Sequence, residues 1–390
     1  IEQARSLGVG ILVFPELTIP GYGHMDLALQ DDFINANLAA LNQIIPLTKD
    51  ITVIIGFIDR DPDARRAGGE SVIYNSAAII SHGRLCAVRD KSLLPGYDIF
   101  YEHRYFSPGR AQGLVEVCGL KIGVGICEDL WDQDYPVQVY PPLVRAGADL
   151  LINLSASPFH PGKLLEREAA IKRALCGKQI PFIYTNLVGT CDGYDGEIVF
   201  DGRSMIFGSN GHLSVLGTGF KEDLLVTDSE TPGTLELSET SQTEEIYRAL
   251  VLGIQDYFRR TGFSRAYIGL SGGIDSSLTA ALVTAALGHK HVVGVTMPSH
   301  ITSDETLRDA RLVAQNLGIR CDIRPISPEY EAWLSSFQKA FGCDPDSLTK
   351  QNKQARIRGT ILMEYSNQDP QGLVVACGNK TEMATGYCTL

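Results

Sequence analysis

Leu270-Ser271-Gly272-Gly273-Ile274-Asp275-Ser276-Ser277 joins the apolar run 266–269 to a second apolar run, 278–283, that has the composition of a helix. This order predicts a strand, a tight glycine turn and a helix N-terminus. Two adjacent glycines let the backbone approach a ligand closely, and the N–H groups of a first helical turn attract anions. The serines add hydroxyl donors, and Asp275 adds a carboxylate where a phosphate-bound cation could lie. The segment therefore indicates phosphate binding, although a helix cap beside a plain turn would have a similar composition.

The turn lacks the Gly-Lys-Ser/Thr ending of a Walker phosphate loop. It resembles instead the pyrophosphate loop of the ATP pyrophosphatases, whose pattern is Ser-Gly-Gly-hydrophobic-Asp-Ser. The resemblance implies that ATP is cleaved between its α and β phosphates, so that AMP activates a carbonyl or carboxyl oxygen. It also implies that ATP is held by Ser271, Gly272, Gly273, Ile274, Asp275, Ser276 and Ser277.

The composition is that of a soluble globular protein. Of the 390 residues, 44% are apolar and 21% are charged, and this length favours two domains over one core. A net charge of −12 argues against a nucleic-acid partner. The nine cysteines include no Cys-x-x-Cys pair, which disfavours a disulfide framework or a zinc site and indicates a reducing compartment. No apolar run is long enough to span a membrane, so we expect a cytoplasmic protein.

Three residues in the first half follow apolar runs that predict buried strands: Glu16, Lys91 and Cys127. Taken singly, they would be a strand-end acid, a surface lysine and a small core cysteine. Together they supply a base, a thiol nucleophile and an ammonium group. The ammonium group and the backbone N–H of Glu128 could stabilise the oxyanion of an attacked amide. The three residues therefore predict an amidase site.

The first half resembles the nitrilase, or carbon–nitrogen hydrolase, superfamily. The matching motifs are Phe14-Pro15-Glu16-Leu17, Lys91-Ser92-Leu93-Leu94-Pro95, Cys127-Glu128-Asp129 and the segment 100–106. The resemblance implies a general base, an oxyanion stabiliser, a nucleophile and a second active-site glutamate at Glu16, Lys91, Cys127 and Glu102, respectively. It also implies a four-layer α-β-β-α sandwich, and we place this amidohydrolase domain at 1–227.

The second half begins after a polar joint. Turn-forming, hydroxyl and acidic residues replace apolar periodicity over 228–245, which we take as a linker. Strand and helix patterns then alternate over 246–390, and this predicts a parallel sheet with helices on both faces. In such a doubly wound sheet, the turn after the first strand opens at the ligand crevice.

Four motifs of this second domain resemble those of the glutamine-dependent NAD synthetases. They are the Ser-Gly-Gly turn, Met297-Pro298-Ser299, Asn352-Lys353-Gln354-Ala355-Arg356-Ile357-Arg358, and Gly378-Asn379-Lys380-Thr381-Glu382 leading to Gly386-Tyr387-Cys388-Thr389. Fusion of a nitrilase-type glutaminase to an ATP pyrophosphatase is itself typical of that family. Without the resemblance, the Met-Pro-Ser segment would fit a plain turn and the basic residues a solvated helix face.

The resemblance implies a reaction at two sites. The nicotinate carboxylate of deamido-NAD attacks the α-phosphate of ATP, which releases pyrophosphate and leaves an NAD-adenylate. Cys127 attacks glutamine and frees ammonia, which crosses an internal tunnel to the adenylate and yields NAD and AMP. The expected partners are glutamine, ATP and deamido-NAD, with Mg²⁺ as the metal. Nitrilase-type domains commonly assemble with symmetry, so we expect a homo-oligomer.

The resemblance assigns further residues by position. Glutamine would be bound by Tyr97, Ser157 and Lys163. Deamido-NAD would be contacted by Asn352, Arg356, Arg358 and Glu382, and Mg²⁺ would be flanked by Asp275 and Glu382. ATP would also contact Cys377, where bacterial members usually have a threonine. The family continues beyond the last motif, so we expect residues after Leu390 to complete the substrate site.

Other interpretations remain open. The protein could be another amidotransferase of the ATP-pyrophosphatase type, or an amidase fused to an unrelated nucleotide domain. GMP and asparagine synthetases share the Ser-Gly-Gly loop but join it to other glutaminase folds. A nucleotide sensor on an inactive amidase scaffold is a third interpretation, which the intact Glu16, Lys91, Glu102 and Cys127 argue against. Formation of NAD from glutamine, ATP and deamido-NAD separates these alternatives.

Overall fold

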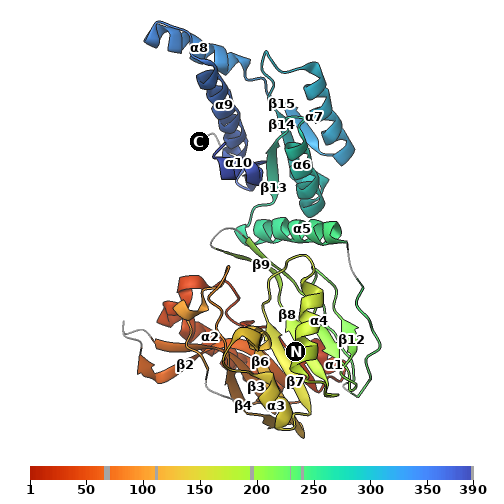
Figure 1. Ribbon diagram of the computed structural model, residues 1–390. Helices are drawn as coiled ribbons and strands as arrows, with labels where there is room; N and C mark the ends of the chain where they lie inside the picture. The colour runs from red at the N-terminus through yellow and green to blue at the C-terminus, as the bar shows by residue number, and fades with distance from the viewer. Residues whose placement is uncertain (66–70, 110–112, 194–196, 229, 239–240, 388–390) are drawn as a thin grey trace. The chain divides into compact units, whose positions relative to one another are not determined.

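The computed structural model of the chain describes residues 1–65, 71–109, 113–193, 197–228, 230–238 and 241–387. The chain forms two compact units, Ile1–Ala249 and Leu250–Leu390, whose elements are labelled in Figure 1. Each unit has its own sheet structure and its own hydrophobic core.

The first sheet of the N-terminal unit has the order β1-β2-β3-β4. Its strands are β1 (Ile11–Val13), β2 (Thr52–Arg65), β3 (Ser71–Ser81) and β4 (Arg84–Asp90). β1 runs parallel to β2, and the other two pairs are antiparallel. Consecutive residues are buried in the first half of β2 and the second half of β3, because both faces of the sheet are covered.

The second sheet has the order β12-β11-β8-β7-β6-β5. Its strands are β5 (Val115–Val117), β6 (Leu120–Ile126), β7 (Leu150–Ser155), β8 (Phe182–Asn186), β11 (Met205–Phe207) and β12 (Leu213–Leu216). The three central strands, β6, β7 and β8, are parallel. β9 (Val188–Asp192) and β10 (Glu197–Asp201) form a separate antiparallel pair.

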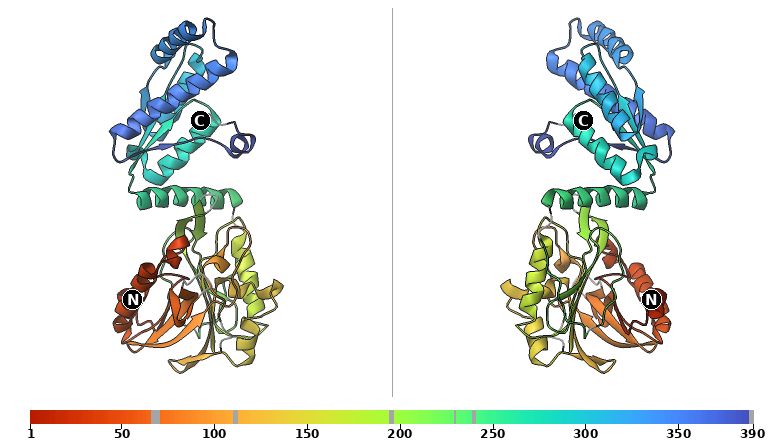
Figure 2. Two further views of the ribbon diagram at one scale, coloured as in Figure 1. Left: turned by 90° about the vertical axis from the view of Figure 1, so that its left-hand side faces the viewer. Right: turned by 90° about the vertical axis from the view of Figure 1, so that its right-hand side faces the viewer.

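The two sheets pack face to face, and helices cover their outer faces (Figure 2). Ile54 and Ile79 of the first sheet share a core with Ile126 and Ile152 of the second. The helices are α1 (Glu2–Ser6) and α2 (Asp31–Ile44) over the first sheet, and α3 (Tyr140–Arg145) and α4 (Lys163–Ala174) over the second. This arrangement confirms the predicted four-layer α-β-β-α sandwich.

The C-terminal unit is built on one parallel sheet of order β15-β14-β13-β16. Its strands are β13 (Arg265–Gly269), β14 (Val292–Thr296), β15 (Arg320–Ile323) and β16 (Gly372–Val375). Its helices are α6 (Ile274–Leu287), α7 (Asp304–Leu317), α8 (Ser327–Phe341), α9 (Ser347–Gln368) and α10 (Lys380–Thr385). α5 (Gln242–Thr261) begins in the N-terminal unit and ends in this one.

Helices pack on both faces of this sheet. Residues of α6 and α7 share one core with β13, and residues of α8 and α9 share another core with β13 and β14. The predicted doubly wound architecture is therefore confirmed. β14 and β15 follow β13 on one side, whereas β16 lies on its other side. The chain direction across the sheet thus reverses beside β13, which is where ligands bind in open α/β sheets.

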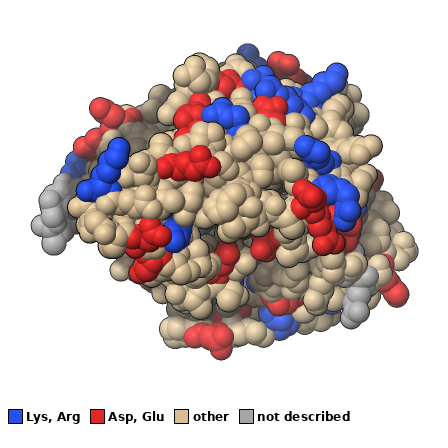
Figure 3. Space-filling view, turned by 90° about the horizontal axis from the view of Figure 1, so that it is seen from above, with Lys and Arg blue, Asp and Glu red and all other residues tan. Residues whose placement is uncertain are grey.

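Short 3₁₀ helices complete the described structure. They are η1 (Met25–Leu29), η2 (Ile45–Thr48), η3 (Glu102–Arg104), η4 (Cys127–Leu130), η5 (Asp132–Asp134) and η6 (His289–His291). No helix among the described residues is long and apolar enough to cross a membrane. Acidic and basic side chains are interspersed on the face drawn in Figure 3.

The expected domain limits 1–227, 228–245 and 246–390 stay predictions. The structure divides its units after Ala249, and α5 begins at Gln242, within the expected linker. The last two residues of the predicted Gly-Tyr-x-Thr motif, Cys388 and Thr389, lie outside the described residues.

Candidate active sites

Glu16 follows β1 and has no exposed surface. The turn that carries it lies directly on β2 at Gly56, where a Cβ would be 2.2 Å from a backbone nitrogen of the turn, so only glycine fits. Glu16 Oε1 accepts hydrogen bonds from Asn75 Nδ2 at 2.7 Å and Lys91 Nζ at 2.8 Å. Its Oε2 accepts one from the backbone N–H of Ala156 at 2.8 Å. These bonds fix the orientation of the carboxylate.

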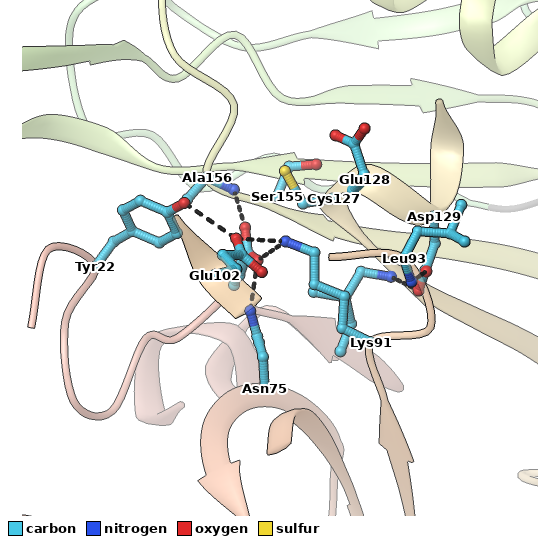
Figure 4. Close-up of polar contacts among 12 residues, drawn as sticks. Tyr22, Asn75, Lys91, Leu93, Glu102, Cys127, Glu128, Asp129, Ser155 and Ala156 are labelled. Carbon is cyan, nitrogen blue, oxygen red and sulfur yellow. Dashed lines mark hydrogen bonds and ion pairs between the residues drawn. The ribbon is translucent and has the colours of Figure 1, made fainter. Parts of the chain in front are cut away.

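Lys91 follows β4 and is 1% exposed. Its Nζ lies 2.8 Å from Glu16 Oε1 and 2.7 Å from Glu102 Oε1, so it bridges the two carboxylates (Figure 4). Burial would lower the pKa of Lys91, but Glu102 and Glu16 raise it well above its usual value. Burial raises the pKa of Glu102 to about 7, against the opposing effect of Lys91. The two neighbouring carboxyl groups therefore favour the charged form of Lys91.

Cys127 stands where β6 ends and η4 begins, with a backbone φ of +43°. This left-handed conformation is costly for a residue with a side chain, and such strain is concentrated at functional sites. Cys127 is 4% exposed, and Figure 4 shows its sulfur close to the Lys91 ammonium group. Burial raises the pKa of Cys127 well above its usual value, and the Glu16 carboxylate adds to this effect. Lys91 acts in the opposite direction and lowers the pKa.

Asp129 ties the cysteine turn to the lysine loop. Its Oδ2 accepts a hydrogen bond from the N–H of Ile126 at 2.9 Å. Its Oδ1 accepts from the N–H groups of Ser92 at 3.0 Å and Leu93 at 2.9 Å. Burial raises the pKa of Asp129 to about 7. One buried carboxyl group therefore fixes the backbones on which Lys91 and Cys127 stand.

A pocket of about 510 Å³ opens beside Cys127, a volume suited to a small-molecule ligand. Its lining includes Tyr97, Glu128, Trp131, Ser157 and Lys163. The Lys163 ammonium nitrogen lies 4.1 Å from the centre of the Trp131 ring, within range of a cation–π interaction.

Glu128 gives this pocket an acidic wall. Its side chain is buried, and its Oε1 accepts hydrogen bonds from Tyr97 Oη at 3.0 Å and Tyr135 Oη at 2.9 Å. Burial and the Glu128 carboxylate raise the pKa of both tyrosines. The phenols therefore stay protonated and keep donating to the carboxylate.

The glycine turn of the C-terminal unit joins β13 to α6. Gly272 has a φ of +83°, and a Cβ at this residue would lie 2.4 Å from the carbonyl oxygen of Thr306. Both facts require glycine. α6 begins after Gly273 without a side-chain cap, so the N–H groups of its first turn remain available to an anion.

The serine hydroxyls of this turn bond mainly to the turn itself. Ser271 Oγ accepts a hydrogen bond from the N–H of Gly273 at 3.2 Å. Ser276 Oγ and Ser277 Oγ both donate to the Gly273 carbonyl, at 3.1 and 2.8 Å. Ile274 is 78% exposed and Asp275 is exposed. The hydroxyls thus hold the loop in shape, and the residues between Ser271 and Ser276 remain largely open to solvent.

The loop after β16 lies beside the glycine turn, because β13 and β16 are adjacent parallel strands. Burial raises the pKa of Cys377, and the Asp275 carboxylate adds to the effect, which places this thiol near the turn. Glu382 Oε2 accepts a hydrogen bond from the N–H of Asn379 at 3.0 Å, and Asn379 Oδ1 accepts one from the N–H of Glu382 at 2.9 Å. This capping box starts α10.

The predicted deamido-NAD residues of α9 lie in different environments. Asn352 is half-buried and Arg356 is exposed, one helical turn apart. Arg358 Nε donates a hydrogen bond to the carbonyl of Met297 at 3.1 Å, at the end of β14. Burial lowers the pKa of Arg358. Arg358 therefore already has a backbone partner in the predicted Met-Pro-Ser turn.

Two family models match this chain: residues 1–232 match Carbon-nitrogen hydrolase and residues 246–390 match NAD synthase. The glutamine-dependent NAD(+) synthetase of Thermotoga maritima is 38% identical, over 100% of this chain and 72% of that protein. The glutamine-dependent NAD(+) synthetase of Synechocystis is 37% identical, over 100% of this chain and 71% of that protein. The chain belongs to the glutamine-dependent NAD(+) synthetases. A solved glutamine-dependent NAD+ synthetase from Acinetobacter baumannii, in complex with ADP, matches with a TM-score of 0.88 and 33% identity, over 100% of this chain and 72% of that one.

Members of this family are carbon–nitrogen ligases that join a glutaminase domain to an NAD synthase domain. The resemblance found in the sequence is thus confirmed, as is the enzyme class, the glutamine-hydrolysing NAD synthases (EC 6.3.5.1). In this synthetase the structure brings Glu16, Lys91 and Glu102 into direct contact and places Cys127 beside them. It also places the three residues predicted to bind glutamine in one pocket with Cys127.

The sequence did not single out Glu128 or Asp129 as side chains of this synthetase site. Both follow Cys127 in the sequence, and this adjacency is the feature that could have identified them as site residues. Their partners, Tyr97 and the backbone at Ser92, are 31 and 37 residues away.

Among the described residues, no group of three or more His, Cys, Asp or Glu side chains is placed to hold a metal ion.

Proposed function

We propose that this synthetase amidates deamido-NAD to NAD through an NAD-adenylate, with ammonia that it releases from glutamine at Cys127. ATP supplies the adenylate and leaves as AMP and pyrophosphate. The observation that carries the proposal is the buried constellation of Glu16, Lys91 and Glu102 beside a strained cysteine that faces a pocket. A base, a cation and a nucleophile held in this way suit acyl transfer from an amide.

In the proposed glutaminase step, Cys127 Sγ attacks the side-chain amide carbon of glutamine and its proton passes to Glu16. The raised pKa of Cys127 keeps the thiol protonated in the free enzyme, so the base must act during the attack. The Lys91 ammonium group and the N–H of Glu128 stabilise the oxyanion. Glu16 then passes this proton to the leaving amino group, which departs as ammonia. Water attacks the glutamyl thioester and gives a proton to Glu16, and glutamate leaves as the Cys127 sulfur takes that proton back.

Glu102 keeps the Lys91 ammonium group in place. It accepts hydrogen bonds from Lys91 Nζ at 2.7 Å and from Tyr22 Oη at 3.2 Å. Lys91 is thus held from both sides, by Glu102 and by Glu16. A charge fixed before the reaction costs no reorganisation when the oxyanion develops.

The pocket offers complementary charges for the α-amino and α-carboxylate groups of glutamine. Glu128, held by the two phenols, suits the α-ammonium group, and the Lys163 ammonium group suits the α-carboxylate. Ser157 adds a hydroxyl group to the same lining. Tyr97 then has two roles, as pocket wall and as the partner that fixes Glu128.

In the synthetase domain, the segment 271–277 would hold the phosphates of ATP through the first-turn N–H groups of α6. The loop of Cys377, which lies near Asp275, would contribute to the same site. Asn352, Arg356 and Glu382 are proposed to contact deamido-NAD directly. Since Arg358 holds the end of β14, we assign it to shaping the substrate wall and the other α9 residues to direct contact.

Asp275 and Glu382 fit Mg²⁺ as ligands shared with phosphate. Mg²⁺ is usually held by one or two carboxylates, substrate phosphates and water. Asp275 and Glu382 each lie in the first turn of a helix, and these two helices follow the adjacent parallel strands β13 and β16. When bound, Mg²⁺ would neutralise phosphate charge.

We also infer that ammonia passes inside the protein, that the enzyme is a homo-oligomer, and that it works in the cytoplasm.

The test is to supply the full-length enzyme with ATP, Mg²⁺ and deamido-NAD, together with either glutamine or ammonium chloride. NAD, AMP and glutamate should form in equal amounts with glutamine, and NAD and AMP with ammonium. Absence of NAD with both nitrogen sources would rule out the proposal.

A further inference from the structure

A chain of buried ion pairs lies behind the glutamine pocket. Arg167 of α4 and Asp201 of β10 are both fully buried, and Arg167 Nη1 is 2.8 Å from Asp201 Oδ1. Arg203 Nε lies 4.0 Å from Asp201 Oδ2, and Arg203 Nη1 lies 2.5 Å from Glu245 Oε1. Two cations therefore alternate with two anions, and the buried cluster is neutral.

At one end of the ion-pair chain, Arg167 contacts a residue that lines the pocket. Arg167 Nη2 donates a hydrogen bond to the Ser157 carbonyl at 2.8 Å, and Arg167 Nε donates to Ser157 Oγ at 3.3 Å. Ser157 lines the pocket. The N–H of the preceding residue, Ala156, donates to Glu16 Oε2 at 2.8 Å. Arg167 thus fixes a segment that touches both the pocket and the base.

At the other end of the ion-pair chain, Glu245 connects the first turns of α5 and α4. Glu245 lies in the first turn of α5, and its Oε2 accepts a hydrogen bond from the N–H of Gly162 at 3.4 Å. Gly162 precedes α4, whose first residue, Lys163, lines the glutamine pocket. α5 is also the helix within which the chain passes from its first unit to its second. Glu245 is therefore linked to both Ser157 and Lys163 without lining the pocket itself.

We propose that Arg167 is a positioning residue for glutamine and that the ion-pair chain makes glutamine affinity depend on Glu245 in the first turn of α5. The proposal rests on the proposed glutaminase function of Cys127. Removing one charge from a buried pair leaves its partner uncompensated, and the remaining groups must rearrange. Along this chain the rearrangement ends at Ser157. A purely structural role would instead lower stability and leave the affinity for glutamine unchanged.

The test is Glu245→Gln in the full-length enzyme, which keeps the shape of the side chain and removes its charge. We expect KM for glutamine, measured by glutamate release, to rise about fivefold or more. We expect kcat to change less than KM, and NAD formation from ammonium to stay at the wild-type rate. The matched control is Glu244→Gln, because Glu244 pairs with Arg248 on the exposed side of the same helix turn and should leave KM unchanged.

Arg167→Lys tests the other end, because lysine keeps the charge but loses the two-sided contact with Ser157. Its KM should rise, and the double variant with Glu245→Gln should be less than additive, since both changes break one network. A wild-type KM in Glu245→Gln, or full additivity, would overturn the proposal. If Glu245→Gln does not fold, Arg203→Lys replaces it with the same expectation. Failure of the wild-type enzyme to release glutamate would instead contradict the glutaminase function.

Discussion

Burial and neighbouring charges together control the protonation of the groups at the proposed glutaminase site. Lys91 keeps its charge because two carboxylates contact its nitrogen, whereas Cys127 keeps its proton because burial and Glu16 oppose a thiolate. A neutral thiol is a weak nucleophile until a base removes its proton. The free enzyme should therefore have an unreactive cysteine that becomes nucleophilic when glutamine is in place.

This inference predicts how alkylation of Cys127 depends on pH. A thiol with a raised pKa gains thiolate as pH rises, so the iodoacetamide rate should increase about tenfold per pH unit between about pH 7 and pH 9. The rate is measured on the Cys127 peptide by mass spectrometry. The denatured protein is the control, because the same thiol should then level off near an ordinary pKa. A plateau below pH 8 in the native enzyme would contradict the neutral thiol.

The site residues that follow strands could be predicted from the sequence. Glu16, Lys91 and Cys127 each come after an apolar run, and strand ends are where α/β enzymes carry reactive groups. Asp129 and Arg167 gave no comparable signal. Their roles depend on contacts with residues 37 and 10 positions away, respectively, and an arginine within a helix is normally a solvated charge.

At the scale of elements, both proposed sites use a turn that follows a parallel strand. After β6, a left-handed Cys127 exposes a side chain to the pocket. After β13, a left-handed Gly272 exposes backbone N–H groups at the start of α6. The difference follows from the ligand, since an amide carbon needs a nucleophilic atom and a phosphate needs donors.

The glycine turn gives a prediction at this scale. Gly272→Ala places a Cβ in a left-handed conformation and 2.4 Å from the Thr306 carbonyl oxygen. Urea unfolding should show a loss of about 1–3 kcal/mol, and KM for ATP in ammonium-dependent NAD formation should rise. Gly342→Ala is the control, because Gly342 has a φ of +70° and open space around it. It should lose stability without a change in KM for ATP.

The elements themselves were largely predictable, but the order of the strands was not. Apolar runs marked β2, β3, β6 and β13 because buried strands need such residues along both faces. The position of β16 beside β13 joins segments about a hundred residues apart, and only this pairing brings the Cys377 loop to the glycine turn. Local periodicity contains no record of such a contact.

At the scale of the whole molecule, each unit contains the residues for one half of the proposed reaction. The pocket beside Cys127 and the residues Glu16, Lys91 and Glu102 lie within Ile1–Ala249, and the glycine turn proposed to bind ATP lies within Leu250–Leu390. The two half-reactions should therefore be separable by single substitutions, although both are needed for glutamine-dependent synthesis.

Cys127→Ala should lower glutamine-dependent NAD formation by about ten-thousandfold, because no nucleophile remains, and leave ammonium-dependent NAD formation unchanged. Asp275→Ala should strongly reduce NAD formation from both sources, because adenylation precedes any use of ammonia. NAD is measured in full-length enzyme with saturating ATP and either nitrogen source. The exposed pair of Glu244 and Arg248 offers a control, since Glu244→Ala should retain both activities. If Cys127→Ala lost synthesis from ammonium as well, the two units would not divide the reaction as proposed.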